Sequence, residues 1–278
     1  MARTLGHHLW RAGLLAAGLF LAWGGAARAD DTPLETLETG DAVRQWAAVG
    51  RLDIGARGFC TGALISDRLV LTAAHCLFDR NTGRRIDPAR IEFRAAWRNG
   101  RAEAYRPIRR AVIHPGYAFD EAVITSRVKN DVALLELAQP IRQGRIDPFA
   151  IASRPRKGDR VGVVSYGADR AEAPSLQEAC RVMARQFGML VLSCDVEPGS
   201  SGAPVFTFSG ARPEIASVIS AQAQVNGRQV SLGTGLERQV ATLRAELEAG
   251  KGVFQDAPPQ IRRIGQSNPG LGAKTVRP

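Results

Sequence analysis

The sequence predicts an all-β protein built from many short antiparallel strands, as in a barrel or a sandwich. Short apolar runs alternate with Gly, Pro, Asp and Asn, which favour turns. The runs are Cys60–Ile65, Leu69–Ala74, Val132–Leu137, Val161–Tyr166, Met189–Leu192 and Ile215–Ile219. Between the third and fourth runs, Pro140 to Pro155 is rich in Pro, Gly and Arg, which predicts a crossover between two halves.

The amino-terminal residues 1–29 have the pattern of an export signal. Arg3 and Arg11 are basic, residues 12–23 form an apolar run, and residues 27–29 read Ala-Arg-Ala, which suits cleavage before Asp30. The run has twelve residues, whereas a membrane-spanning helix needs about 20. We therefore expect a secreted or periplasmic protein without a transmembrane anchor, in a compartment where disulfides persist.

Four further segments follow the signal. Residues 30–45 are polar and acidic without periodicity, which predicts a flexible arm. Residues 46–145 and 146–250 form the two β halves, and residues 251–278, rich in Pro, Gly and basic residues, are expected to be a disordered tail. One helix is predicted near the end of the second half, because four apolar residues share a face before Gly250. They are Leu236, Val240, Leu243 and Leu247.

The net charge of +10 first suggests a polyanion partner. Residues 1–29 contribute three bases and no acids, residues 251–278 contribute five bases and one acid, and +3 remains for residues 30–250. Aromatic residues make up only 6% of the chain, and the part expected to fold has no dense basic block. Nucleic-acid binding as the main function is therefore disfavoured.

Two motifs of the first half contain residues suited to proton transfer. His75 ends an apolar run among small residues, and Cys60 and Cys76 are placed to form a disulfide that holds its loop. A His beside a Cys also suits half of a zinc site, but no second His or Cys pair lies at suitable spacing. Asp131 precedes the apolar run Val132–Leu137, where a buried carboxylate needs a hydrogen-bonding partner such as an imidazole.

The third motif is the turn Pro198–Pro204, in which hydroxyl groups are flanked by glycines. Glycine lets successive backbone N–H groups point at one position, as stabilisation of an oxyanion requires. A Gly-Ser turn by itself is more often an ordinary loop. Its combination with the His and Asp motifs is what favours a catalytic site.

In the order His75, Asp131, Ser201 these motifs resemble the trypsin-like, chymotrypsin-fold serine proteases. The matching segments are Leu71–Cys76, Asn130–Leu135 and Gly199–Pro204, with weaker echoes at His114–Tyr117 and Ser165–Gly167. The resemblance covers about residues 46 to 250. It implies two six-stranded antiparallel β-barrels with the active site in the cleft between them, His75 and Asp131 from the first and Ser201 from the second.

The resemblance also implies the role of each residue. Ser201 is the nucleophile, His75 the general base and then acid, and Asp131 orients the imidazole. The N–H groups of Gly199 and Ser201 form the oxyanion hole. The competing hydroxyl of Ser200 is set aside, because Gly202 follows Ser201 and Gly199 lies two residues before it. The resemblance implies no metal or cofactor. The protein is expected to be a monomer, and its expected partners are protein or peptide substrates.

The chain departs from trypsin at the residue before the nucleophile. Trypsin has an Asp there that pairs with a freshly cut Ile-Val-Gly-Gly amino terminus, whereas this chain has Ser200 and no such sequence upstream of Trp46. Exported bacterial relatives, including glutamyl endopeptidases, more often have Asn or Ser there. We hypothesise that removal of the signal suffices for activity, or that a pro-segment lies within residues 30–45.

A hairpin register predicts the second disulfide. If residues 186–188 form a three-residue turn, Arg185 faces Met189 and the same register places Cys180 opposite Cys194. This selects Cys60–Cys76 and Cys180–Cys194 among three possible connectivities.

Substrate preference is the least determined feature. Asp195 lies six residues before Ser201, where trypsin keeps the acid that binds Arg or Lys. An ordinary Asp at the surface or at a strand end is the favoured interpretation, because Asp195 directly follows a cysteine expected in a disulfide. A glutamyl preference is less favoured because residues 218–220 contain no His, and His114 before Pro115 suits a turn. A catalytically inactive, protease-like binding module of the cell envelope stays open as the alternative function, since motifs cannot prove turnover.

Overall fold

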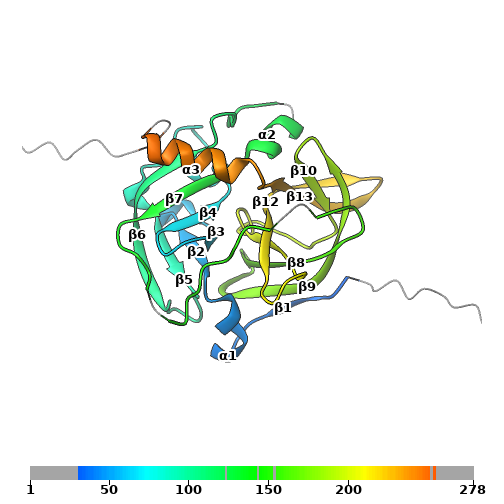
Figure 1. Ribbon diagram of the computed structural model, residues 1–278, viewed down its shortest axis with the longest axis horizontal. Helices are drawn as coiled ribbons and strands as arrows, with labels where there is room; N and C mark the ends of the chain where they lie inside the picture. The colour runs from blue at the N-terminus through cyan, green and yellow to red at the C-terminus, as the bar shows by residue number, and fades with distance from the viewer. Residues whose placement is uncertain (1–30, 123, 143, 153–154, 251–252, 255–278) are drawn as a thin grey trace, which may run out of the picture.

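The computed structural model describes residues 31–122, 124–142, 144–152, 155–250 and 253–254 of the chain. The expected signal, residues 1–29, lies outside the described residues, and so does the expected basic tail apart from Val253 and Phe254. The described chain forms two β-barrels side by side, with its first and last described residues on opposite sides (Figure 1).

The first barrel contains six antiparallel strands that close through pairing of β6 with β7. Its strands are β2 (Val49–Asp53), β3 (Phe59–Leu64), β4 (Leu69–Thr72), β5 (Glu92–Ala95), β6 (Ala104–Ile113) and β7 (Ala133–Leu137). Short 3-10 turns link or precede them at Arg44–Trp46, Gly55–Arg57, Ala74–Leu77 and Pro88–Arg90. Because the sheet closes on itself, the six strands form a continuous ring of pairings. β14 (Val253–Phe254) pairs in addition with β6.

The second barrel also contains six antiparallel strands and closes through pairing of β8 with β9. Its strands are β8 (Arg160–Gly167), β9 (Arg170–Gln186), β10 (Met189–Leu192), β11 (Pro204–Thr207), β12 (Glu214–Val225) and β13 (Arg228–Gly235). The predicted fold class, two six-stranded antiparallel barrels with a helix near the end, is confirmed. The predicted crossover between the two halves connects β7 to β8, and its described residues contain no strand of either barrel.

A continuous apolar core joins the two barrels. Trp46 ahead of β2 packs on Phe206 of β11 with ring centroids 4.9 Å apart, and Phe149 from the crossover lies 4.7 Å from the same ring. All three side chains are buried. The barrels are therefore held as one unit, which fixes the geometry of residues that face each other across their junction.

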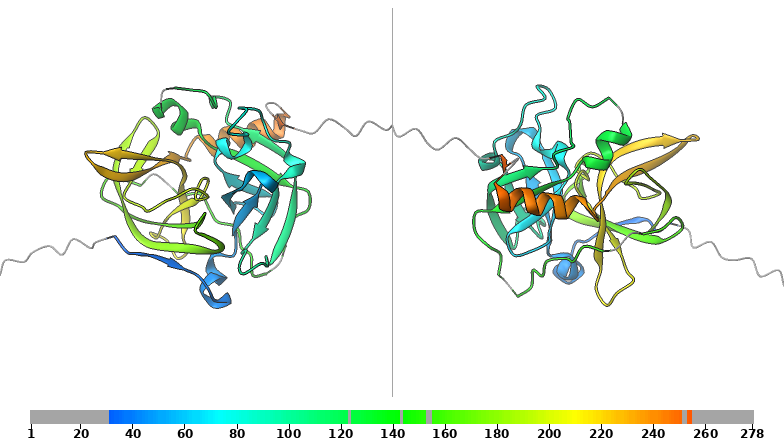
Figure 2. Two further views of the ribbon diagram at one scale, coloured as in Figure 1. Left: turned by 180° about the vertical axis from the view of Figure 1, so that it is seen from behind. Right: turned by 45° about the horizontal axis from the view of Figure 1, so that its top comes forward.

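The helix α3 (Gln239–Ala249) follows the second barrel but packs on β6 and β7 of the first (Figures 1 and 2). Three residues of the predicted apolar face, Val240, Leu243 and Leu247, lie on the helix and are buried. Leu236 is buried as well, but it precedes the helix, which begins later than predicted. Gly250 ends the helix in the left-handed conformation, with φ of 67°. The helix thus fastens the end of the second half to the first.

Residues 30–45 differ from the flexible arm expected from the sequence. β1 (Leu34–Thr36) pairs with residues 175–177 of β9, and α1 (Gly40–Val43) begins at the Thr39 cap. Leu37 and Val43 are buried. The segment has too few apolar residues to show periodicity, yet its backbone pairs with an edge of β9 and its two buried apolar side chains extend the core.

We therefore expect a chain that begins at Trp46 to be less stable than one that begins at Asp30. Loss of the buried Leu37 and Val43 side chains is expected to cost about 3 to 6 kcal/mol of unfolding free energy. Urea unfolding of the two forms measures the difference. Glu35→Ala, which alters an exposed side chain of β1, is the control, and equal stability of the two forms would contradict a structural role for the segment.

The hairpin between β9 and β10, which contains the second disulfide, has a different turn from the one expected. Residues Phe187 and Gly188 form a two-residue turn, with φ of 51° and 85°, and Gln186 rather than Arg185 faces Met189. A bulge between Val191 and Leu192 then shifts the register by one residue. Because the bulge offsets the shorter turn, Cys180 still meets Cys194, and both Cys60–Cys76 and Cys180–Cys194 are bonded.

Of the helices in the described ranges, none has both the length and the apolar character needed to cross a membrane.

Candidate active site

His75 lies where the first barrel meets the second. It follows β4 in the 3-10 turn Ala74–Leu77, and its small neighbours Ala73 and Ala74 are fully buried. The Cys60–Cys76 disulfide ties this turn to β3. The imidazole is thus held on a short, cross-linked turn rather than on a free loop.

Asp131 is buried beside His75, between α2 (Ile124–Asn130) and β7, with 2% of its surface exposed. Its Oδ1 accepts a hydrogen bond from the backbone N–H of His75 at 2.8 Å, and its Oδ2 lies 2.7 Å from Nδ1 of His75. An ionised carboxylate only accepts hydrogen bonds, so this contact requires the proton on Nδ1. Nε2 of His75 is then left with its lone pair.

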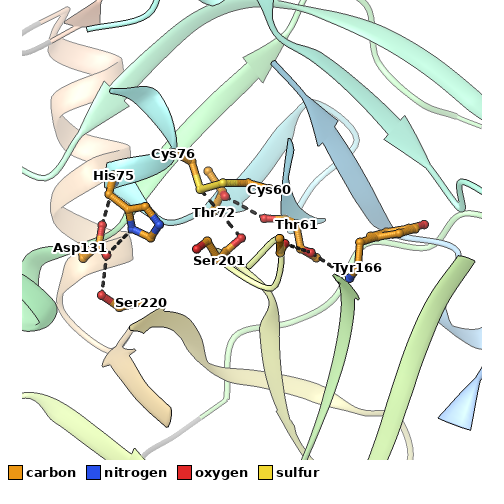
Figure 3. The surroundings of a disulfide bond; sticks show 10 residues. Cys60, Thr61, Thr72, His75, Cys76, Asp131, Tyr166, Ser201 and Ser220 are labelled. Atoms are coloured by element: carbon orange, nitrogen blue, oxygen red, sulfur yellow. Dashed lines mark hydrogen bonds and ion pairs between the residues drawn. A yellow bond between two sulfur atoms is a disulfide. The ribbon is translucent and has the colours of Figure 1, made fainter. Parts of the chain in front are cut away.

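Ser220 of β12 is a third partner of the buried carboxylate. Its hydroxyl donates to Oδ2 of Asp131 at 2.5 Å, which links the second barrel to the His–Asp pair (Figure 3). Sequence reasoning considered this position only for a missing histidine. Only a physical argument could have predicted a further partner for Asp131. A carboxylate has four lone-pair sites, so in an apolar setting it needs more than one hydrogen-bond donor.

Ser201 lies on the side of the His75 ring opposite Asp131 (Figure 3). It belongs to the segment Glu197–Gly202, called the serine loop below. A Cβ atom on Gly202, where φ is +78°, would overlap the Thr72 hydroxyl and the Thr61 carbonyl oxygen. Only glycine therefore lets the serine loop approach the first barrel this closely.

Two backbone N–H groups of the serine loop have no acceptor among the described residues. Neighbouring N–H groups are used: Ser200 donates to the carbonyl oxygen of Glu197 at 2.9 Å, and Gly202 donates to that of Ile219 at 2.8 Å. The N–H groups of Gly199 and Ser201 make no such bond within the described ranges. Unused donors on either side of Ser200 are what an oxyanion site needs.

The two adjacent serines differ in exposure. Ser200 is fully buried, and its hydroxyl lies 3.3 Å from the Tyr166 carbonyl oxygen and 3.3 Å from the Ser165 hydroxyl. Ser201 is partly exposed. A substrate can therefore reach the hydroxyl of Ser201 but not that of Ser200.

Thr61 of β3 joins the serine loop to both barrels, and sequence reasoning did not single it out. Its backbone N–H donates to the Ser201 carbonyl oxygen at 2.9 Å, and its hydroxyl donates to the Gly199 carbonyl oxygen at 3.0 Å. The same hydroxyl accepts a bond from the Tyr166 N–H at 3.0 Å. Nothing in the local sequence marks Thr61, because its partners Tyr166 and Gly199 are 105 and 138 residues away.

We expect Thr61→Val to lower both stability and kcat. Valine has the shape of threonine but leaves the Gly199 carbonyl and the Tyr166 N–H without this partner, which costs about 2 kcal/mol of unfolding free energy. Thr61→Ser keeps the hydroxyl and is the matched control. Urea unfolding and steady-state kinetics measure both effects, and a valine variant as active and stable as the serine variant would contradict the role of the hydroxyl.

The possible zinc ligands near His75 are already used. The sulfur atoms of Cys60 and Cys76 lie within 4.8 Å of a His75 ring nitrogen, but the two sulfurs are bonded to each other. Sulfur in a disulfide is not the thiolate that zinc requires.

Asp195 and His114 lie outside the His75–Asp131 contact. The Asp195 carboxylate accepts a bond from the side-chain amide of Gln177 at 3.2 Å and is exposed. A role for Asp195 in binding basic side chains stays a prediction. His114 occupies a turn, its Nδ1 accepts the Gly116 N–H at 3.2 Å, and burial lowers its pKa.

A cavity of about 450 Å³ opens beside His75 and the serine loop. Its walls include Phe59, the Cys60–Cys76 disulfide, Ile86 and Gly199. The cavity is large enough to hold amino-acid side chains beside His75 and Gly199.

Two closed barrels that bring a His–Asp pair and a glycine-flanked serine together have the chymotrypsin fold. The family model described as Trypsin matches residues 39–233, which is most of the chain. The chain therefore belongs to the trypsin family.

Three relatives show how distant the likeness is. A glutamyl endopeptidase of Bacillus licheniformis is 25% identical over 174 residues, covering 61% of this chain and 52% of its own. A trypsin of Phaedon cochleariae is 34% identical over 84 residues, 30% of this chain and 29% of its own. Phenoloxidase-activating factor 3 of Holotrichia diomphalia is 27% identical over 193 residues, covering 56% and 54%. The chain thus spans about half the length, or less, of these relatives.

Among solved structures, that of a Glu endopeptidase in complex with MPD superposes with a TM-score of 0.64. The match covers 78% of this chain and 97% of the other, with 15% sequence identity. At this identity the likeness concerns the fold.

Proposed function

We propose that this protein is an exported serine endopeptidase that hydrolyses peptide bonds through Ser201, His75 and Asp131. The observation that carries the proposal is the buried Asp131 carboxylate, which holds Nδ1 of His75 at 2.7 Å while Ser201 lies across the ring. Family membership adds support, because the chain matches the trypsin family and is similar to a glutamyl endopeptidase. The substrate class is protein or peptide.

Acylation follows from the protonation states. With the proton of His75 on Nδ1, Nε2 takes the proton of the Ser201 hydroxyl as its oxygen attacks the carbonyl carbon of the scissile bond. Asp131 stabilises the imidazolium that forms. The same Nε2–H then protonates the leaving amine, the C–N bond breaks, and an acyl ester on Ser201 remains. Water deprotonated by Nε2 hydrolyses this ester and restores the serine.

The tetrahedral oxyanion is proposed to lie between the N–H groups of Gly199 and Ser201. Both groups lack an acceptor within the described ranges, so they are available without breaking an existing hydrogen bond. Each such donor is commonly worth about 3 kcal/mol of transition-state stabilisation.

Export is proposed from the signal-like residues 1–29 and from the two disulfides. Disulfides persist in oxidising compartments, and this chain joins all four of its cysteines in two pairs. The periplasm and the external medium both satisfy this condition.

The test is incubation of the purified chain that begins at Asp30 with a mixture of defined peptides, followed by mass spectrometry of the products. New ends at internal peptide bonds, with cleavage blocked by a fluorophosphonate, are expected. Cleavage after Arg or Lys would support the predicted role of Asp195, whereas cleavage after other residues would reject it. Failure to label or cleave under any condition of pH would favour the inactive binding module.

A further inference from the structure

A buried arginine lies directly behind the serine loop. Arg170 begins β9, and 10% of its side chain is exposed. Its Nη1 donates to the Ser165 carbonyl oxygen at 2.7 Å, and its Nη2 donates to the Ser165 and Ser200 hydroxyls at 3.1 and 3.3 Å. Its Nε lies 2.7 Å from Oε1 of Glu197. One guanidinium thus contacts two residues of the serine loop.

The surroundings make this ion pair different from a solvated one. Burial lowers the pKa of Arg170. Burial and the neighbouring Asp169 carboxylate raise the pKa of Glu197, and Arg170 opposes that rise. The Arg170 side chain is 10% exposed and that of Glu197 is 26% exposed. Removing one partner of this partly buried pair leaves the other charge uncompensated, which costs more than breaking a fully exposed pair.

Gly167 at the end of β8 leaves the space that the pair occupies. A Cβ atom there would overlap Oε1 of Glu197 and come within 2.9 Å of Cζ of Arg170. Gly167 is not in the left-handed region of backbone conformation, so its backbone tolerates alanine. A side chain at this position would push the Glu197 and Arg170 side chains aside, which provides a way to displace the pair without changing a charge.

Two hydrogen bonds, neither of which involves Arg170 directly, hold the backbone on either side of Gly199. The Ser200 hydroxyl accepts a bond from the Glu197 N–H at 3.3 Å, and the Pro198 carbonyl oxygen accepts one from the Ala168 N–H at 2.8 Å. Gly199 lies between these fixed residues and has no side chain of its own to hold it. Its orientation therefore depends on the residues on either side, together with the bond that its carbonyl oxygen accepts from the Thr61 hydroxyl.

We propose that Arg170 is a positioning residue that holds the serine loop so that the Gly199 N–H group points at the oxyanion. The inference rests on the proposed function. In trypsin an Asp before the nucleophile pairs with a freshly cut amino terminus; in this chain the loop contributes Glu197 and Ser200, and the cation comes from Arg170. Because Arg170 is an internal residue of the chain, the loop is ordered without a new amino terminus.

The first experiment compares Arg170→Gln and Arg170→Lys with Arg160→Gln. Glutamine removes the charge, and kcat is expected to fall about 100-fold with KM within about threefold, as when an oxyanion donor is lost. Lysine keeps a charge for Glu197 but loses the planar fork, so a fall of about tenfold is expected. Arg160, an exposed residue of β8 that lies 3.9 Å from exposed Glu178, is the matched control and should retain wild-type kcat.

A second experiment uses Gly167→Ala, which displaces Glu197 and Arg170 by volume alone. Its kcat is expected to fall in the same range as that of Arg170→Gln. A peptide aldehyde, whose hemiacetal oxygen occupies the oxyanion position, should lose affinity in parallel with kcat in both variants. A merely structural role for Arg170 would lower the unfolding midpoint but leave kcat and aldehyde affinity of the folded fraction unchanged.

A third experiment tests whether catalytic activity is independent of the amino terminus of the chain. Chains that begin at Asp30 and chains with extra residues ahead of Asp30 are expected to have the same kcat. Activity that requires the free amino terminus would overturn the proposal, as would wild-type kcat in Arg170→Gln or, should that variant not fold, in Gly167→Ala. A wild-type protein that neither cleaves nor labels would instead overturn the proposed function itself.

Discussion

Replacing Ser201 with alanine is expected to abolish peptide hydrolysis and fluorophosphonate labelling. The loss in kcat should be on the order of a million-fold, the size found when the nucleophile of a serine protease is removed. The physical reason is that the oxygen atom that forms the acyl ester is absent, while the N–H donors of Gly199 and Ser201 remain. Labelling followed by peptide mapping, together with steady-state kinetics, measures the effect.

Ser200→Ala is the informative control, because it removes the neighbouring hydroxyl. The Ser200 hydroxyl is fully buried, so its loss should not prevent labelling, although the contact with Arg170 is weakened and kcat is expected to fall modestly. Labelling that persists in Ser201→Ala and disappears in Ser200→Ala would contradict the choice of nucleophile. Alanine at 201 changes no backbone contact, so the variant is expected to fold like the wild type.

The fold was predictable because the signal is local. Alternating apolar runs and turn residues predicted a barrel or a sandwich, and the family resemblance implied two barrels. The helix face was visible in the spacing of Val240, Leu243 and Leu247. The turn at Phe187 and the bulge beside Val191 were not predictable, because a bulge depends on the partner strand. The order of residues 34–46 depends on β9, which lies about 140 residues later in the chain.

The candidate site was predictable to the extent that its residues carry motif signals. His75, Asp131 and Ser201 stand in short patterns that the family shares. Ser220, Thr61 and Arg170 act through partners that are distant in the sequence. The residues next to them in the chain therefore give no indication of these contacts. Only the general requirement that buried charges and carbonyls find partners pointed to such residues.

Replacing Asp131 with asparagine is expected to lower kcat about 10⁴-fold at neutral pH while leaving the site assembled. The Oδ1 atom of asparagine can still accept the backbone N–H of His75, which Asp131 accepts at 2.8 Å. The other position becomes an NH₂ group facing Nδ1 of His75, where the structure has Oδ2 at 2.7 Å. Two donors cannot bond to each other, so Nδ1 must lose its proton and accept, and the proton moves to Nε2.

A protonated Nε2 in neutral imidazole can no longer take the proton of the Ser201 hydroxyl, and this inversion rather than unfolding is the expected cause of the loss. Fluorophosphonate labelling should slow in proportion to kcat, while KM changes little and the unfolding midpoint shows that the variant is folded. Asp147→Asn, which alters an exposed carboxylate paired with exposed Arg212, is the matched control and should behave as wild type. A kcat of Asp131→Asn within about tenfold of wild type would show that the Asp131–His75 contact serves the fold and not the reaction.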